Sequence, residues 1–146
     1  MLIVRIPETA QEWEQYYNLR FTVLREPWGQ LKGSEVLKDE DQADHAMVID
    51  SESNIVVGVA RMQINTPTQG QVRCVAVSPN VQGKGVGKLL MNYLENLARE
   101  KSIKEIILDA RENALKFYKS IGYEIYEDSY LLFGEIQHYR MRKELF

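Results

Sequence analysis

Hydrophobic and polar positions along the chain follow two different spacings, and the change of spacing separates strands from helices. Short apolar or alternating runs, bounded by turn-forming residues such as Pro7 and the 51–54 segment, predict β-strands. The strands are expected at residues 2–6, 46–50, 55–64, 71–77, 105–108, 123–126 and 135–141.

A first helix is predicted to begin at Thr9, because Thr9 and Glu12 have the spacing of a capping box. Pro27 and Gly29 end its pattern. Residues that recur at helical spacing share one face, and this face should be buried. It consists of Trp13, Tyr17, Arg20 and Leu24.

Two further helices are predicted in the second half of the chain. The longer one follows a glycine-rich segment at residues 83–87, and the shorter one is expected to be capped by Asn113 and ended by Gly122. Their inward stripes consist of Val86, Leu90, Tyr93, Leu94 and Leu97 in the longer helix and of Ala114, Phe117 and Ile121 in the shorter one.

The order of these elements is β-α-loop-β-β-β-α-β-α-β-β. Helices follow some strands while hairpins join others, which favours an α/β fold with a mixed sheet. The segment 30–45 is polar and irregular, with room for a short helix. Since no repeat or Pro/Gly/Ser-rich linker divides the chain, residues 1–146 are expected to form a single domain.

Composition narrows the class of protein. Of 146 residues, 45% are apolar and 27% charged, and the net charge of −3 argues against a nucleic-acid partner. The single cysteine excludes an internal disulfide and a cysteine-based metal cluster, and no metal is expected. Without an apolar run of membrane-spanning length or an export signal, a cytoplasmic protein that does not bind membranes is expected. The oligomeric state, a homodimer included, stays open.

The chemistry lies in the segment from Val72 to Lys88, which has the pattern of a strand, a tight turn and a glycine-rich helix start. Three glycines at alternate positions between residues 83 and 87 let a ligand approach the backbone closely. The first N–H groups of a helix lack internal acceptors and lie at the positive end of its dipole. Together these features predict a site for phosphate or pyrophosphate, with Lys84 and Lys88 adding positive charge.

Two common phosphate-binding patterns do not fit this segment. A Walker A loop needs Gly-x4-Gly-Lys-Ser/Thr, but Gly87-Lys88 is followed by Leu89. The dinucleotide fingerprint needs a glycine where Lys88 stands, and it should lie in the first βαβ unit rather than in the middle of the chain.

The sequence Gln82-Gly83-Lys84-Gly85-Val86-Gly87 matches Gln/Arg-x-x-Gly-x-Gly/Ala and closely resembles the acetyl-CoA loop of the GNAT N-acetyltransferase superfamily. Downstream, the segment Leu108–Tyr123 resembles the second block of that superfamily, in a loose form because Ala114 follows Asn113 directly. Both blocks stand in the expected order, and the resemblance extends over residues 71–126.

This resemblance implies a GNAT-like fold, whose mostly antiparallel sheet of about six to seven strands is flanked by helices and splayed at the acetyl-CoA cleft. It implies acetyl-CoA as cosubstrate, with the pantetheine arm along Val75–Val77 and the pyrophosphate on the amides of Gly83–Lys88. The implied cofactor-binding residues are Val75, Ala76, Val77, Gln82, Gly83, Lys84, Gly85, Val86, Gly87, Lys88, Asn113 and Tyr118.

For catalysis, the resemblance implies direct attack of a primary amine on the thioester, without a covalent enzyme intermediate. The Val75 N–H would stabilise the oxyanion, and Tyr118 would protonate the departing thiolate, since a phenol keeps its proton at neutral pH. From the residues alone, Tyr118 also fits as a core tyrosine, and Cys74 fits as a small buried strand residue.

An alkyl ammonium acceptor must first lose a proton, and the sequence offers several bases. His138, His45, carboxylates and ordered water are candidates, although both histidines also fit structural roles. Arg20 could shape the acceptor site. An acidic run suits a cationic acceptor, but such a run is more typical of a solvated loop. It consists of Glu35, Asp39, Glu40, Asp41 and Asp44.

The sequence thus predicts an N-acetyltransferase that acts on a primary amine, and a small molecule is favoured over a peptide as the acceptor. Three alternatives stay open. They are a protein-lysine acetyltransferase, a non-catalytic acyl-CoA-binding or regulatory module, and a protein that binds NAD or ATP instead of coenzyme A.

Overall fold

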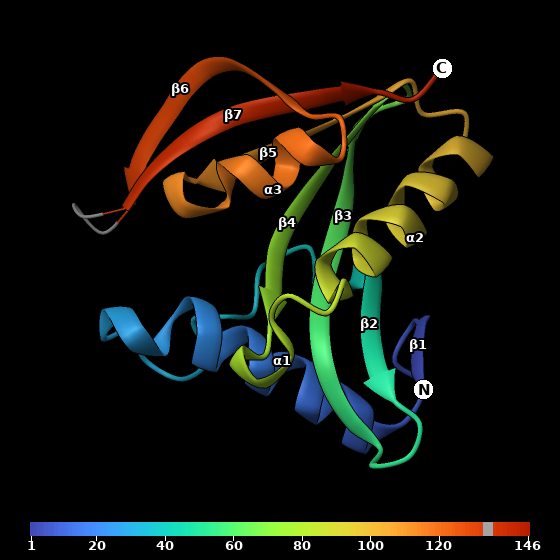
Figure 1. The fold of residues 1–146 in the computed structure, drawn as a ribbon, viewed down its shortest axis with the longest axis vertical. Helices are drawn as coiled ribbons and strands as arrows, with labels where there is room; N and C mark the ends of the chain where they lie inside the picture. Colours follow the sequence, from blue (N-terminus) through green and yellow to red (C-terminus); the bar gives the residue numbers. More distant parts are fainter. Residues whose placement is uncertain (133–135) are drawn as a thin grey trace.

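The structure, a computed structural model, describes residues 1–132 and 136–146 and contains a seven-stranded sheet with helices on both faces (Figure 1). The strand order is β1-β2-β3-β4-β5-β7-β6, in which only the β4–β5 pair is parallel. The strands are β1 (Leu2–Arg5), β2 (Asp44–Asp50), β3 (Ile55–Thr66), β4 (Gln69–Val77), β5 (Glu105–Arg111), β6 (Glu124–Leu132) and β7 (Ile136–Glu144). The predicted mixed, mostly antiparallel α/β fold is confirmed. Glu135, predicted to start the last strand, lies outside the described residues.

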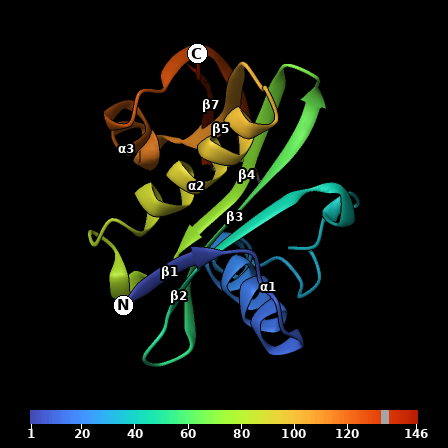
Figure 2. The same cartoon turned by 90° about the vertical axis from the view of Figure 1, so that its right-hand side faces the viewer.

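In the part of the chain that the structure describes, three α-helices and four 3₁₀ turns connect the strands. The α-helices are α1 (Ala10–Leu24), α2 (Val86–Glu100) and α3 (Leu115–Ser120). The 3₁₀ turns are η1 (Glu26–Trp28), η2 (Glu40–Gln42), η3 (Pro79–Val81) and η4 (Glu112–Ala114). Helix α2 crosses β2, β3 and β4, and the two termini lie at opposite ends of the molecule (Figure 2).

The start of α1 confirms the predicted capping box. The Glu12 N–H donates to the Thr9 hydroxyl at 3.1 Å, and the Thr9 N–H donates to the Glu12 carboxylate at 3.4 Å. Arg5 also binds the Glu12 carboxylate, at 2.8 Å, which ties β1 to the helix. The helix ends at Leu24, and Gly29, with φ of 70°, closes the turn that contains Pro27.

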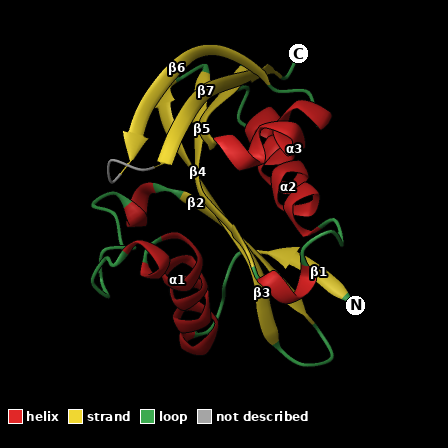
Figure 3. Cartoon of the chain, turned by 60° about the vertical axis from the view of Figure 1, so that its left-hand side comes forward, coloured by secondary structure: helices red, strands yellow, loops and turns green. Residues whose placement is uncertain are grey.

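Helix α1 packs on one face of the sheet, and α2 and α3 pack on the other (Figure 3). The predicted stripe of α2 is confirmed at Val86, Leu90 and Leu94, which are buried in the larger core, whereas its other members, Tyr93 and Leu97, are only partly buried. On α1 the most buried aromatic residue is Tyr16, which the predicted face did not include. Gly58 of β3 lets α2 lie close to the sheet, since a Cβ there would overlap Val86 Cγ1.

Two predicted boundaries are wrong near the end of β5. Asn113 does not cap a helix, because it lies inside η4, and α3 begins only at Leu115. Strand β5 continues to Arg111 instead of stopping at Leu108, since its last residues are polar on one side and apolar Ala110 still faces the core. Gly122 does end α3, with φ of 102°. The extension of β5 matters because its added residues form one wall of a cavity.

Candidate active site

The sheet opens between its two parallel strands. Val72 of β4 faces Leu108 of β5 at the end of their ladder, yet β4 continues to Val77 and β5 to Arg111. A cavity of about 190 Å³ lies where the two strands diverge. It is lined by Leu24, Arg25, Val72, Arg73, Cys74, Val75, Leu108, Asp109, Arg111, Ala114, Tyr118 and His138. The predicted splay of the sheet is therefore present, and it places a cavity at the centre of the molecule.

A β-bulge bends β4 at this cavity. The pairing of β3 with β4 shifts between Val59 and Arg61, so that Ala60 faces both Cys74 and Val75. Cys74 has φ of 59°, in the left-handed region. It lies on strand β4 as predicted, but it is half-buried and lines the cavity, so the predicted burial is wrong. The bulge turns this side chain toward the opening, and a cysteine gives no sequence signal for such a backbone conformation.

Beyond the bulge, β4 presents backbone N–H groups to the gap. The Ser78 N–H donates to Val57 O of β3 at 2.8 Å. Because successive peptide groups of a strand point to opposite edges, the Val77 N–H points away from β3 and toward the gap. This orientation suits the predicted binding of a ligand along the backbone of β4.

The turn after β4 has the geometry of an anion site. Gly83 and Gly85 have φ of 84° and 81°, and α2 begins directly after them. Leu89 is the first residue whose N–H bonds within the helix, to Gly85 O at 3.1 Å. The N–H groups from Gly85 to Lys88 therefore have no helical acceptor and lie at the positive end of the dipole.

Three residues predicted to bind the cofactor are not fully available to a ligand. The Lys84 N–H donates to Val81 O at 3.2 Å within the turn, which leaves only the Lys84 side chain, exposed like that of Lys88, for a ligand. The side chain of Ala76 is buried against α1, so only its backbone can face a cofactor. Asn113 is exposed in η4 and does not line the cavity.

Gly87 controls how closely α2 approaches α3. A Cβ at position 87 would lie 3.0 Å from Phe117 Cζ, which is closer than an ordinary van der Waals contact. The glycine thus allows the first turn of α2 to rest on the helix that carries Tyr118. The anion site and the cavity are consequently held next to each other.

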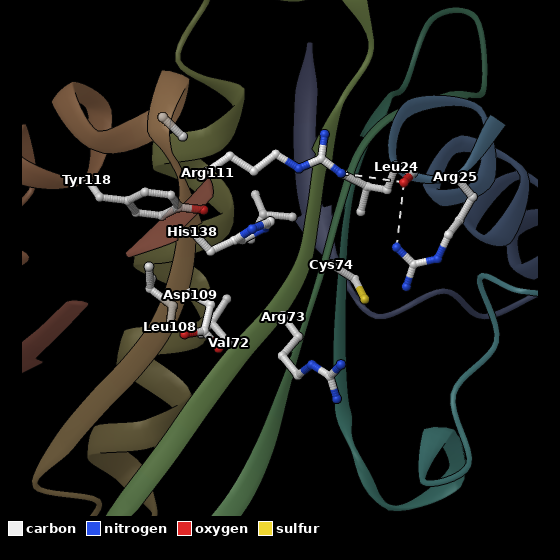
Figure 4. Close-up of a pocket in the computed structure, with 12 residues that line it drawn as sticks. Leu24, Arg25, Val72, Arg73, Cys74, Leu108, Asp109, Arg111, Tyr118 and His138 are labelled. Carbon is white, nitrogen blue, oxygen red and sulfur yellow. Dashed lines mark hydrogen bonds between the residues drawn. The ribbon is translucent and has the colours of Figure 1, made fainter. Parts of the chain in front are cut away.

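The three predicted catalytic residues come together in the cavity. Val75 lies on β4, Tyr118 on α3 and His138 on β7, and all three line it. The Tyr118 ring is 7% exposed, and its hydroxyl points into the cavity beside His138 (Figure 4). Burial alone raises the pKa of Tyr118 above its ordinary value, so the phenol stays protonated at neutral pH.

The opposite side of the cavity is formed by arginines that the sequence reasoning did not single out. Arg111 reaches from β5 across the gap, where it donates to Leu24 O at 3.4 Å (Figure 4). Arg25, at the end of α1, donates to Ser34 O at 3.3 Å. Arg73 lies on β4 and is exposed. Tyr118 and Arg25 therefore meet the cavity from opposite faces of the sheet.

The acidic run is not a solvated loop. Arg20 and Arg61 are fully buried, and Glu40 accepts hydrogen bonds from both, at 2.8 and 3.2 Å. Asp39 binds Arg61 through both carboxylate oxygens, at 2.9 and 2.8 Å. Buried guanidinium groups need such partners, so Asp39 and Glu40 are engaged by the protein itself, whereas Asp41 of the same run is exposed. The engagement of Asp39 and Glu40 weakens the other interpretation of this run, in which it attracts a cationic acceptor.

Arg20 and His45 belong to this buried network. Arg20 also donates to the Tyr16 hydroxyl at 3.1 Å. His45 lies 2.6 Å from Glu40 O through Nε2 and 2.7 Å from the Tyr16 hydroxyl through Nδ1. Because a carbonyl only accepts, Nε2 carries the proton and Nδ1 accepts from Tyr16. Burial lowers the pKa of His45, which keeps the ring neutral in a structural position outside the cavity.

Comparison with known proteins identifies the family. The sequence matches the family model of the acetyltransferase (GNAT) family over residues 12–123. The chain belongs to the GNAT acetyltransferase family. As a member it is an acyltransferase of the N-acetyltransferase type, and the family uses acetyl-CoA as cosubstrate.

Individual relatives agree with this assignment. An uncharacterized N-acetyltransferase of Bacillus subtilis, YjcF, is 30% identical over 72% of this chain and 73% of its own length. Glucosamine 6-phosphate N-acetyltransferase of Trypanosoma brucei brucei is 36% identical over a shorter stretch, 40% of each protein. The resemblance to the GNAT superfamily that the sequence suggested is thereby confirmed.

Solved structures share the fold of this acetyltransferase. A proposed N-acetyltransferase from Lactobacillus plantarum superposes with a TM-score of 0.85 at 20% identity, over 99% of both chains. An aminoglycoside 6'-N-acetyltransferase in complex with coenzyme A superposes with a TM-score of 0.81 at 15% identity, over 100% of this chain and 97% of the other. At these identities the likeness concerns the fold alone.

Within residues 1–132 and 136–146, no three His, Cys, Asp or Glu side chains are grouped so as to hold a metal ion. No helix in this part of the chain is long and apolar enough to cross a membrane.

Proposed function

We infer that this acetyltransferase transfers the acetyl group of acetyl-CoA to the primary amine of a small molecule, by direct attack in a ternary complex. The observation that carries the proposal is the opening of the β4–β5 ladder beyond Val72 and Leu108. It joins a cavity to a glycine turn whose N–H groups suit a pyrophosphate. When bound, the cosubstrate supplies a thioester whose C–S bond breaks as the amine nitrogen forms the new C–N bond.

Three residues of the chain have roles in this transfer. Val75, which lines the cavity from β4, donates its N–H to the oxygen that gains negative charge. Tyr118 donates its proton to the departing sulfur, a role supported by its buried hydroxyl inside the cavity. His138 is the candidate base for the acceptor ammonium, because it lines the same cavity from β7.

The shape of the cavity supports a small acceptor. Arg111 bridges to the end of α1 and closes one side of the opening. A cavity of about 190 Å³ suits a compact amine better than a peptide, which needs a long groove. Two of the similar proteins are named for small amines, namely glucosamine 6-phosphate and aminoglycosides.

The proposal is tested by ligand-induced thermal stabilisation and then by thiol release. Acetyl-CoA and CoA should raise the melting temperature of the protein, whereas NAD and ATP should not. Stabilisation by NAD or ATP but not by CoA would overturn the proposal. A panel of amines and lysine peptides, assayed for release of free CoA, should give turnover with small amines. Tight CoA binding without turnover on any amine would instead identify a non-catalytic module, and turnover on peptides alone would identify a protein acetyltransferase.

A further inference from the structure

We propose that Arg25 and Arg73 form an anion-binding subsite at the acceptor side of the cavity. The acceptor of this enzyme is then a primary amine that also carries a carboxylate or phosphate group. This inference rests on the proposed function, since it names the class of amine that enters the same cavity.

The charges of the buried network cancel one another. Arg20 and Arg61 are fully buried, and Asp39 and Glu40 bind them at 2.8 to 3.2 Å. Two cations thus face two anions, and this group contributes little net charge to the neighbouring cavity. Asp39 and Glu40, which could have attracted a cationic amine, are therefore already neutralised.

The charged groups that line the cavity are mostly cations. Arg25, Arg73 and Arg111 line it together with one carboxylate, Asp109. Asp109 is paired with Arg140 at 3.1 Å, so its charge is compensated from outside the cavity. A cavity whose lining carries one sign of charge concentrates ligands of the opposite sign.

Neither Arg25 nor Arg73 forms an ion pair with a carboxylate of the described residues. Arg25 is held by backbone carbonyls, Ser34 O at 3.3 Å and Leu24 O at 3.5 Å, which orient the guanidinium without neutralising it. Part of its donor set stays available for a ligand, because a guanidinium has five N–H donors.

Arg73 is exposed and lines the cavity. It faces Arg61 in the β3–β4 ladder, but Asp39 and Glu40 already balance the charge of Arg61. Arg73 itself forms no ion pair within the described residues, so an incoming carboxylate or phosphate can bind its planar guanidinium group. Capping of a helix end would explain Arg25 but not Arg73.

The subsite lies on the correct face for an acceptor. Arg25 belongs to the end of α1, whereas the glycine turn leads into α2, and these helices cover opposite faces of the sheet (Figure 3). The pyrophosphate of coenzyme A would use the α2 side. The two arginines are therefore left for a different anion, in reach of an amine that enters from the α1 side (Figure 4).

Four amines with the same two-carbon spacer test the subsite: ethanolamine, ethylenediamine, β-alanine and phosphoethanolamine. Acetyl-CoA binding is measured first by calorimetry, and its absence would refute the proposed function rather than the subsite alone. Each amine is then titrated into CoA-saturated protein, so that the readout does not depend on turnover. We expect phosphoethanolamine and β-alanine to bind about tenfold or more tightly than the other two. Equal or tighter binding of ethylenediamine would overturn the subsite.

Variants assign the effect to the two arginines. Arg25→Gln and Arg73→Gln should each remove most of the preference for phosphoethanolamine, whereas Arg142→Gln, the same change at an exposed position outside the cavity, should keep it. Arg73→Glu should reverse the preference toward ethylenediamine, and this gain of binding cannot result from unfolding. An unchanged preference in Arg25→Gln and Arg73→Gln would refute the assignment.

Discussion

Val72 and Leu108 are the last facing residues of the parallel ladder, and the cavity opens directly beyond them. Their side chains are buried in the larger core, so the point of divergence is anchored by packing. Arg73 of the proposed subsite directly follows Val72 on β4 and begins the cavity wall. The bulge follows immediately. Within a few residues of β4, the hydrogen bonding to β5 therefore ends, backbone donors become available, and the acceptor side of the cavity begins.

The bulge predicts that two substitutions of Cys74 differ in their effect on the stability of the fold. The left-handed φ of 59° is easy for glycine and strained for a β-branched residue. Cys74→Val should therefore be less stable than Cys74→Gly by about 1 to 2 kcal/mol in the free energy of unfolding, measured with urea. Equal stability of the two variants would mean that β4 is regular in solution.

Tyr118→Phe should lower turnover while acetyl-CoA affinity stays unchanged. Loss of a general acid typically costs about a hundredfold or more in rate. The removed hydroxyl points into the cavity, and its ring packing is preserved in phenylalanine. The measurements are thiol release at saturating amine and calorimetry with acetyl-CoA. Tyr93→Phe, on half-buried Tyr93 of α2, is the matched control and should retain turnover.

The pH profile of turnover gives an independent test of Tyr118. Its pKa is raised by burial, and the active form of an acid is the protonated one. Activity that depends on this proton is present at neutral pH and is lost only as pH rises through the raised pKa, above about 10. An alkaline limb below pH 9 that disappears in Tyr118→Phe would show that Tyr118 acts as the acid but that its pKa is not raised.

Gly85→Asp should abolish coenzyme A binding through charge rather than through steric overlap. No atom lies within 4 Å of a Cβ at this position, but φ of 81° strains any other residue, and a carboxylate repels a pyrophosphate. Gly33→Asp is the control, since Gly33 also has positive φ, at 106°, and open space, but lies in the 30–45 segment. Calorimetry should show normal affinity for Gly33→Asp. A similar loss in both variants would indicate general strain.

Local patterns made much of this structure predictable. The apolar stripe of α2 and the Thr9–Glu12 capping box follow from residues a few positions apart, and both are observed. The glycines after β4 also predicted the turn and the start of the helix, because this signal is local as well. The order of these elements, together with the two motifs, was enough to identify the fold.

Features that depend on distant residues could not be predicted. The acidic run resembles a solvated loop because nothing near it in sequence shows that Arg20 and Arg61 will be buried against it. Arg73 and Arg25 are ordinary charged residues until the fold brings them to one cavity. The bulge at Cys74 arises from a mismatch between two strands, which no single segment encodes.

Glu40→Gln should destabilise the protein, because it removes a charge shared by two buried guanidinium groups. Breaking such a network costs about 2 to 4 kcal/mol in the free energy of unfolding, measured by chemical denaturation at pH 7. Asp41→Asn, the same kind of change at the exposed neighbouring residue, should have an effect within about 0.5 kcal/mol. Equal effects of the two substitutions would contradict the network.

The same variant predicts how stability depends on pH. Burial opposes ionisation of Glu40, but hydrogen bonds and charges from Arg20, Leu37 N–H and Arg61 outweigh it and lower its pKa. A carboxylate whose pKa is depressed in the folded state contributes its full stabilisation of the fold above its unfolded pKa of about 4.3. This contribution is lost as the pH falls through the pKa of the folded state. The stability difference between the native protein and Glu40→Gln should therefore be largest at neutral pH and shrink below about pH 4. A difference that stayed constant from pH 7 to pH 3 would show that the glutamate acts through its shape and hydrogen bonds rather than through its charge.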